Sequence, residues 1–355
     1  MLRLFIHYFS AMGIKLDYRV ITKNILQYVI IILLTLFLLE LTLFAFLKYY
    51  NLNSILPYFK SVSRSYYMSK DRNIIQFMPE CAKYDDELTY TLKEGDCIIK
   101  NREFEVKYDI NSLGLRDDEK SLDKPEIIVL GDSHAMGWGV AQDKTFAFLT
   151  ENNSNKNVLN AAISSYGTAR ESLILDRIDK SKLKYLIIQY CQNDYGENKS
   201  FVNNDFKLNI TSEAEYQKTV NKHINRKYKP FRFSSMLIRN ISRTMRGKNK
   251  VVDQAVDRSG EFNVLIEILS NISNKIGNDV KIIIFETNGH NNNDSKLFDY
   301  IETIKKENKL GILQDQIMTL DTSEILTGTD YFILDDHMNQ NGHQKVANEL
   351  LKLIQ

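Results

Sequence analysis

The chain has 355 residues, with 46 Lys and Arg against 45 Asp and Glu, so its formal net charge is +1 at pH 7. This length accommodates one domain of about 250 residues together with accessory parts. A charge so close to neutral creates no field that would favour nucleic acid as a partner. No internal repeat is apparent.

The first element along the chain is a long apolar segment. Residues 1–24 form a short mixed segment expected at a membrane interface, and residues 25–47 are almost continuously apolar. About 20 apolar residues cross the hydrocarbon core of a bilayer as a helix, and no convincing small-residue cleavage site follows this run. The sequence therefore predicts one retained transmembrane helix, with Tyr49 and Tyr50 at the interface.

Glu40 places a carboxyl group inside this predicted helix. An ionised carboxylate is costly in the bilayer core, so Glu40 is expected to be protonated, to lie near the interface, or to pack against another helix. Two interpretations stay open: a partner helix near Glu40, or simple tolerance near one end of the span.

Basic residues flank the apolar segment on both sides and do not decide its orientation. Cys81 and Cys97 lie close together after the predicted helix, and they predict a disulfide formed in an oxidising compartment. Three reduced thiols are the alternative. Cys191 follows a predicted strand and is expected to be a buried small side chain. We therefore expect a single-pass membrane protein whose main domain lies on the extracytoplasmic side.

Residues 48–106 are expected to form a linker and a small cap, because aromatic and polar residues alternate there. Residues 107–355 are expected to form the main domain, in which apolar strands alternate with helical patterns. The strands are expected near 126–130, 156–160, 184–190 and 280–285, with another within 311–334. This alternation predicts a parallel sheet with helices on both faces, a three-layer α/β/α fold.

Residues 196–259 interrupt the alternation as an insertion that should have structure of its own. From Gln217 to Val252 this insertion holds eleven Lys and Arg and no Asp or Glu. One interpretation is a lid that contacts anionic lipid headgroups or an anionic polymer. The other is a solvated helical face with Met236, Leu237 and Ile241 packed beneath it.

Polar motifs follow the predicted strands. Gly131-Asp132-Ser133 follows the first, residues 160–167 include Ser165, and Asn193 lies in Cys191-Gln192-Asn193-Asp194. Ligand sites of open parallel sheets lie at the carboxyl ends of the strands, so these motifs are expected at one edge. Near the end of the chain, Asp335-Asp336-His337 adds a histidine and two carboxylates. A serine, a histidine and an aspartate are the parts of an acyl-transfer nucleophile.

These motifs, in this order, resemble those of the SGNH (GDSL-type) hydrolase superfamily, over roughly residues 107–355. The resemblance implies a flavodoxin-like SGNH domain and a serine esterase that needs no cofactor and no metal. It also implies that Ser133 is the nucleophile, that His337 is the base oriented by Asp335, and that an oxyanion hole comprises the N–H groups of Ser133 and Ser165 and the Asn193 side chain.

Three positions depart from the family pattern. Ser165 and Cys191 stand where glycine is usual, and Leu334 stands where an aspartate often precedes the histidine by three residues. The acid is then Asp335 or Asp336. We favour Asp335, because residues two apart in an extended segment point to the same side.

The predicted function is hydrolysis of an O-acyl ester on an acylated glycan, for instance of the cell envelope, or on a lipid-linked ester. Transfer of an acyl group to a sugar hydroxyl by the same triad is one alternative. A binding or scaffold protein with a decayed triad is another. Further candidates for lining the cleft are His134, Trp138, Asp194 and His290.

Overall fold

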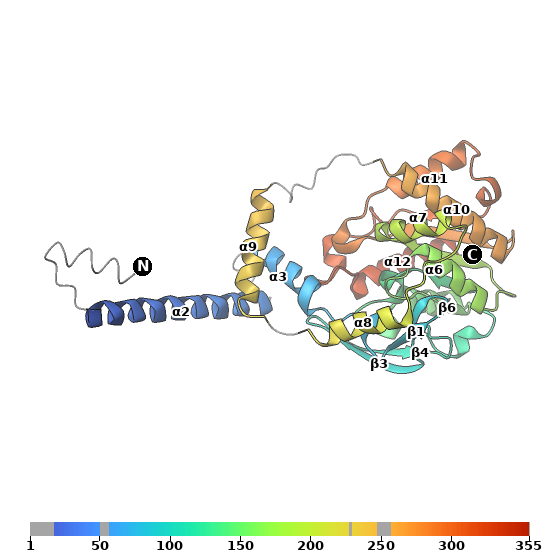
Figure 1. Ribbon diagram of the computed structural model, residues 1–355. Helices are drawn as coiled ribbons and strands as arrows, with labels where there is room; N and C mark the ends of the chain where they lie inside the picture. The colour runs from blue at the N-terminus through green and yellow to red at the C-terminus, as the bar shows by residue number, and fades with distance from the viewer. Residues whose placement is uncertain (1–17, 50–56, 227–228, 247–256, 355) are drawn as a thin grey trace. The chain divides into compact units, whose positions relative to one another are not determined.

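The computed structural model describes residues 18–49, 57–226, 229–246 and 257–354. The chain forms two compact units: Met1–Tyr66 with Lys227–Val252, and Tyr67–Arg226 with Asp253–Gln355. Figure 1 colours the chain from blue at its N-terminus to red at its C-terminus and labels some of the elements. Most of the N-terminal segment expected at 1–24 lies outside the described residues.

The larger unit is built on a five-stranded sheet in the order β6-β5-β7-β8-β9, with every pairing parallel. The strands are β5 (Ile127–Leu130), β6 (Val158–Asn160), β7 (Tyr185–Tyr190), β8 (Lys281–Glu286) and β9 (Ile317–Leu320). β5 is the first strand of this sheet in the sequence, and it lies inside the sheet with the later strands β6 and β7 on its two sides. This is the doubly wound arrangement, which leaves a crevice at the carboxyl ends of the strands where the order reverses.

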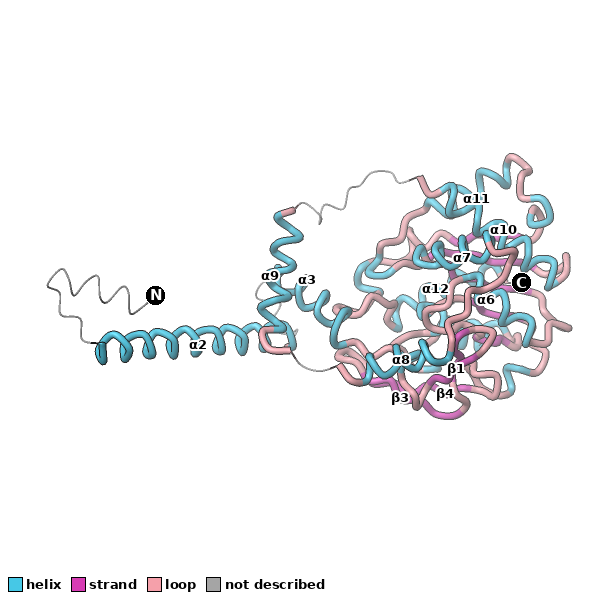
Figure 2. Tube along the Cα trace, viewed as in Figure 1, coloured by secondary structure: helices cyan, strands magenta, loops and turns pink. Residues whose placement is uncertain are grey.

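Both faces of this sheet are buried, which explains why its strands are apolar without alternation. Ile128 and Leu130 of β5 belong to one apolar cluster, and Ile127 and Val129 belong to the other. The first cluster includes apolar side chains of α6 (Thr168–Ile174), α10 (Ser259–Ile276) and α11 (Lys296–Lys306). The second includes apolar side chains of α5 (Phe146–Ser154) and α12 (Gln340–Leu353). Figure 2 distinguishes these helices from the strands. The predicted three-layer α/β/α fold is confirmed.

Two antiparallel hairpins precede the sheet: β1 (Ala82–Asp85) with β2 (Thr89–Leu92), and β3 (Gly95–Lys100) with β4 (Glu105–Ile110). Cys81 and Cys97 are joined by a disulfide, with their Cα atoms 5.3 Å apart. Ile99 and Tyr108 belong to the same buried cluster as Ile127 of the sheet. The second hairpin is therefore part of the main core.

The predicted insertion at 196–259 is divided between the two units. The helices α7 (Tyr195–Asn203) and α8 (Glu213–Ile224) belong to the larger unit, and α9 (Arg232–Met245) belongs to the smaller one. The basic residues between Gln217 and Val252 are therefore divided between the two compact units. Lys248 and Lys250 lie outside the described residues.

The smaller unit comprises α2 (Tyr18–Lys48), α3 (Pro57–Tyr66) and α9. The stretch Arg19–Lys48 is long and apolar enough to cross a membrane, judged by its length and composition. Leu43, Leu47, Val62, Tyr66 and Phe233 form the buried apolar cluster that joins the three helices.

Candidate active site

The candidate nucleophile stands at the turn that leaves β5. Ser133 is the first residue of α4 (Ser133–Met136), and the Asp132 carboxylate caps this helix by accepting the His134 N–H at 2.8 Å. Gly131 has φ of +150°, and a Cβ on it would lie 2.6 Å from the Cβ of Ala135. Only glycine fits so tight a turn without displacing its neighbours.

A buried glutamine on the neighbouring strand holds the same turn. The Oε1 atom of Gln189 accepts the N–H groups of Asp132 and Ala135, each at 3.2 Å. Gln189 has no exposed surface, so both bonds are shielded from competing water. The sequence did not single out Gln189, because one polar residue inside an apolar strand carries no motif.

Arg116 holds the other side of the nucleophile turn. Its guanidinium is fully buried and donates to the carbonyl oxygens of Met136, Gly137 and Val140 at 2.9, 2.5 and 2.6 Å. It also lies over the Tyr108 ring, 3.7 Å from the centroid. Carbonyl dipoles and an aromatic face thus surround this buried charge, while its Nε atom has no hydrogen-bond partner among the described residues.

Ser133, His337 and Asp335 form a continuous hydrogen-bonded chain. His337 Nε2 lies 2.6 Å from Ser133 Oγ, and His337 Nδ1 lies 2.5 Å from an oxygen of Asp335. The Asp335 side chain is fully buried, while Ser133 and His337 keep 8% and 7% of their surface exposed. This geometry has the form of a nucleophile, a base in contact with it, and an acid behind the base.

A second carboxylate also reaches the histidine. Asp336 Oδ1 lies 3.1 Å from His337 Nδ1 and 2.8 Å from Nη1 of Arg72. The same Arg72 nitrogen is 3.8 Å from Asp335. Asp335 is thus the closer and the more deeply buried of the two acids, and Asp336 divides its charge between the imidazole and the guanidinium.

The two carboxylates control the charge state of the histidine. Burial lowers the pKa of His337, but the charges of Asp335 and Asp336 and the hydrogen bonds to both outweigh burial and raise this pKa to about 9. Burial likewise acts to raise the pKa of Asp335 and that of Asp336. The charge of His337, its hydrogen bonds and the charge of Arg72 together outweigh burial and lower the pKa of both acids. An ionised pair of acids around a cationic imidazole is therefore favoured at neutral pH.

Tyr67, from the segment before the sheet, and Trp138, from the turn after β5, both contact Asp335. The Tyr67 hydroxyl, from the short η2 helix (Tyr67–Asp71), donates to Oδ2 of Asp335 at 2.5 Å. Trp138 Nε1 approaches the same oxygen at 3.3 Å, and its ring centroid lies 5.7 Å from that of His337. Burial raises the pKa of Tyr67, so its hydroxyl remains a donor at neutral pH.

Glu103 fixes the backbone that carries the acid. Its carboxylate accepts the N–H groups of Ile333, Leu334 and Asp335 at 2.7, 2.8 and 2.8 Å. Three charge-assisted bonds to consecutive amides define the path of the loop just before His337. Neither Glu103 nor Tyr67 nor Arg72 was predicted, because each comes from a distant segment with no spacing that points to the triad.

We expect Glu103→Gln to lower kcat about 10- to 100-fold with little change in KM, because a loosened loop misplaces Asp335 and His337. Glutamine can keep only one acceptor oxygen, so stability should also fall by about 1–3 kcal/mol. Glu105→Gln is the matched control, since Glu105 is exposed on the same hairpin and pairs with Lys100. Equal kinetics for the two variants would contradict a positioning role for Glu103.

The expected oxyanion donors lie on separate turns. Within the described part of the chain, the N–H groups of Ser133 and Ser165 donate no hydrogen bond to another protein group. Ser165 has φ of +62° and is exposed, and its hydroxyl accepts from Gln76 Nε2 at 2.9 Å. Glycine, which the sequence resemblance implies at this position, favours this left-handed conformation, which serine adopts at a cost of about 1 kcal/mol.

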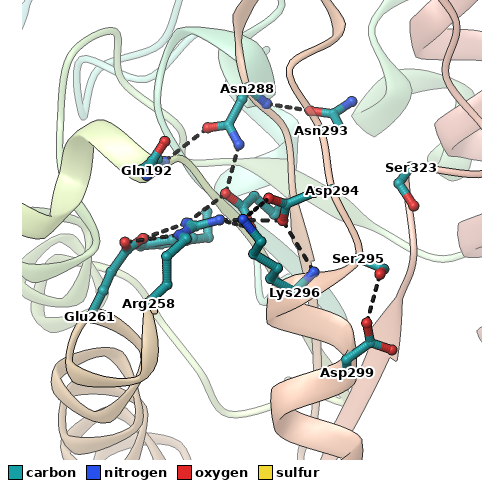
Figure 3. A network of polar contacts seen from close by, with 12 residues as sticks. Gln192, Arg258, Glu261, Asn288, Asn293, Asp294, Ser295, Lys296, Asp299 and Ser323 are labelled. Atoms are coloured by element: carbon teal, nitrogen blue, oxygen red, sulfur yellow. Dashed lines mark hydrogen bonds and ion pairs between the residues drawn. The ribbon is translucent and has the colours of Figure 1, made fainter. Parts of the chain in front are cut away.

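Asn193 lies with an exposed side chain on the turn η7 (Gln192–Asp194), and a buried polar network supports that turn (Figure 3). Asn288 Oδ1 accepts the Gln192 N–H at 3.0 Å, and its amide donates to Glu286 at 2.6 Å. Arg258 in turn pairs with Glu286 and Glu261. The turn that carries Asn193 is therefore tied to the end of β8 and to the start of α10.

The other candidate cleft residues have varied settings. His134 is buried, with its ring centroid 4.7 Å from that of His337. Asp194 is also buried, and it accepts from the Cys191 N–H at 3.3 Å and from the Thr168 hydroxyl at 3.2 Å. The backbone N–H of His290 donates to the Asp336 carbonyl at 3.1 Å.

Among the residues that the structure describes, one group of side chains lies close enough together to hold a metal ion: Asp335, Asp336 and His337. However, the two carboxylates already bond the imidazole, and the Arg72 guanidinium contacts Asp336 directly. A fixed positive charge at this position disfavours a cation. The set fits an acid–base pair better than a metal site.

No family model matches the chain, and no curated protein matches it. Among solved structures, a member of the lipolytic protein G-D-S-L family from Veillonella parvula matches over 64% of this chain and 96% of that chain, with 13% identity and a TM-score of 0.37. The acetylxylan esterase Axe2 from Geobacillus stearothermophilus matches over 65% and 94%, with 13% identity and a TM-score of 0.35.

A family two carbohydrate esterase from Clostridium thermocellum, in complex with cellohexaose, also matches. The match covers 65% of this chain and 63% of that chain, with 13% identity and a TM-score of 0.36. The matched structures are thus of the class that the sequence resembles. At these identities and TM-scores the likeness carries no inference about activity, which must come from the residues of this chain.

Proposed function

We propose that the chain is a membrane-anchored serine esterase of the SGNH type that hydrolyses an O-acyl ester. The observation that carries the proposal is the hydrogen-bonded chain from Asp335 through His337 to Ser133. A serine hydroxyl is a weak nucleophile at neutral pH, and it becomes reactive when a base can accept its proton during attack. Ser133 follows the carboxyl end of β5, the edge where open parallel sheets place their ligands.

In the proposed mechanism, Ser133 Oγ attacks the ester carbonyl carbon while His337 Nε2 accepts the hydroxyl proton. Asp335 stabilises the resulting imidazolium and holds its tautomer. The tetrahedral intermediate collapses to an acyl-serine, and the alcohol leaves with the proton from His337. Water then attacks the acyl-serine by the same route, which releases the carboxylic acid and restores Ser133.

The oxyanion of each intermediate would be bound by the N–H groups of Ser133 and Ser165 and by the Asn193 side chain. One such donor contributes roughly 3 kcal/mol to transition-state stabilisation. Among the described residues the N–H groups of Ser133 and Ser165 find no protein acceptor, which supports this role because they remain available to a ligand.

The proposed substrate is an acylated glycan or a lipid-linked ester close to the membrane. Support comes from α2, whose length and composition suit a membrane span. The bond between Cys81 and Cys97 supports an extracytoplasmic position, because disulfides persist in oxidising compartments. The proposed division of the chain remains a span at 25–47 followed by a catalytic domain at 107–355.

The test is an assay of the purified full-length chain with acetylated oligosaccharides, in which released acetate and acetylated products are both measured. Esterase activity predicts free acetate in proportion to enzyme, with no acetyl group appearing on an added sugar acceptor. Acetyl transfer to the acceptor would favour the acyltransferase alternative. Absence of both, together with absence of hydrolysis of a short p-nitrophenyl ester, would favour a binding protein.

The rate of hydrolysis is expected to rise with pH between about 6.5 and 9. His337 must be neutral to accept a proton, and its pKa of about 9 keeps it protonated below that pH. The pH profile of kcat/KM reports the free enzyme. An acid limb centred near the ordinary histidine pKa of about 6.5 would contradict the influence of the two carboxylates.

A further inference from the structure

The exposure of α2 changes abruptly at Glu40. Every residue from 23 to 39 is exposed, whereas Glu40, Leu43 and Leu47 are buried. The helix has 31 residues, and at 1.5 Å per residue it is about 46 Å long. A bilayer core is only about 30 Å thick. The part of the helix before Glu40, residues 18–39, is about 33 Å long at the same rise per residue. This part therefore suffices to cross the core, and the covered part can extend beyond it.

The first buried residue of α2 caps another helix. The two carboxylate oxygens of Glu40 accept the N–H groups of Phe233 and Ser234, at 2.9 and 3.0 Å. These amides belong to the first turn of α9, where N–H groups have no partner within the helix. A carboxylate there also interacts favourably with the helix dipole. The partner helix left open by the sequence is thus α9 of the same chain, which crosses the end of α2 in Figure 1.

Only part of the apolar face of α9 is covered by α2 and α3. Phe233 is buried, with its ring centroid 5.4 Å from that of Phe44. Further along the helix, Ile238, Ile241 and Met245 are 66%, 41% and 82% exposed. They lie three to four residues apart, so they share one face of the helix.

Basic residues occupy the other side of α9. Arg239 lies two residues from Ile241, which is about 200° around a helix, and Arg246 follows Arg239 after seven residues. Both arginines are exposed. An apolar face opposite a basic face is the pattern of helices that lie in the plane of a membrane surface.

We propose that α9 is an interfacial helix that lies along the surface of the bilayer, docked on the membrane-spanning helix by Glu40. Ile238, Ile241 and Met245 enter the headgroup–acyl boundary, and Arg239 and Arg246 contact anionic phospholipid headgroups. The bilayer is the proposed occupant of the apolar face of α9. The exposed part of α2 ends at Leu39, and the next residue, Glu40, caps the first turn of α9. The proposal rests on the proposed membrane anchor.

Fluorescent labels at single cysteines can test this arrangement in the full-length chain, reconstituted in nanodiscs with anionic lipid. The label is placed at Ile241→Cys, Met245→Cys, Arg239→Cys or Phe37→Cys, in a Cys191→Ser background that keeps the disulfide. Doxyl lipids should quench the labels at 241 and 245 roughly threefold more strongly than the label at 239, because they sit at the acyl boundary. An aqueous quencher should show the reverse order.

The label at 37 separates two ways of failing. If doxyl lipids do not quench it, the anchor itself is wrong. If they quench it but leave the labels at 241 and 245 accessible to the aqueous quencher, only the interfacial helix is wrong. Protection of 241 and 245 from both quenchers would indicate a protein partner and would also overturn the proposal.

Hydrogen exchange tests the docking contact. Glu40→Ala should accelerate exchange of the Phe233 and Ser234 amides roughly tenfold or more, because both lose their acceptor, and it should reduce lipid quenching at 241. Thr42→Ala is the matched control, since Thr42 is exposed on the same helix and its hydroxyl donates to the Leu38 carbonyl at 2.8 Å. Unchanged exchange in Glu40→Ala would overturn the capping role.

Discussion

Ser133→Ala is expected to abolish ester hydrolysis and covalent labelling by a fluorophosphonate probe. The Ser133 hydroxyl lies 2.6 Å from His337 Nε2, and no other group on the nucleophile turn can take its place in the proposed mechanism. Loss of the serine of a triad lowers kcat by about a million-fold in a well-studied protease. Turnover of a p-nitrophenyl ester and peptide mapping of the labelled site would measure the effect.

A buried serine outside the site provides the control for that experiment. Ser172 in α6 is fully buried, and its hydroxyl bonds the Ala169 carbonyl at 2.7 Å. Ser172→Ala should keep activity and labelling, and both variants should unfold cooperatively. Undiminished labelling of Ser133→Ala would assign the nucleophile to a different residue.

The sheet was predictable from the sequence because its strands are buried on both faces. Runs such as Ile127–Leu130 are apolar without alternation, and glycine-containing turns and polar motifs follow them. The motifs that follow the strands converge because parallel strands end at one edge. In this part of the chain, the apolar pattern of each strand and the topology of the parallel sheet thus indicate the same fold.

The surroundings of the triad were not predictable in the same way. Tyr67, Arg72 and Glu103 contact Asp335, Asp336 or their backbone across more than 200 residues of sequence. No periodicity or spacing links such positions, because the path of the chain between them decides which side chains meet. The alternating pattern of the second hairpin likewise predicted strands but not the core against which they pack.

The same limit applies to the basic segment from Gln217 to Val252. The sequence predicted one insertion at 196–259, and the chain places α8 and α9 in different compact units. A charge count along the sequence cannot detect such a division. By contrast, Glu40 was a local signal, because an ionised carboxylate in an apolar helix is costly. The sequence left open a partner helix or simple tolerance near one end of the span, and the structure supplies two backbone N–H groups.

The roles of the two acids can be separated by Asp335→Asn and Asp336→Asn. We expect Asp335→Asn to lower kcat by about four orders of magnitude, because an amide in place of the triad acid favours the wrong imidazole tautomer. Asp336→Asn should cost much less. Asp336 lies 3.1 Å from His337 Nδ1, against 2.5 Å for Asp335, and it also bonds Arg72.

Asp336→Asn should instead move the pH profile. The charge of Asp336 helps to raise the pKa of His337 to about 9, so its removal should shift the acid limb of kcat/KM towards lower pH. The variant would then be relatively more active near pH 7 than near pH 9, compared with the unmodified chain. Measuring kcat/KM from pH 5 to 10 for both variants would resolve the two effects.

Opposite results would exchange the roles. If Asp336→Asn removed most of kcat while Asp335→Asn shifted only the pH profile, Asp336 would be the triad acid. Tyr67→Phe separates loss of charge from loss of support, since it removes one hydrogen bond to Asp335 and leaves the carboxylate in place. If Asp335 is the acid, Tyr67→Phe should lower kcat modestly, because an acid with one donor fewer holds the imidazole less firmly.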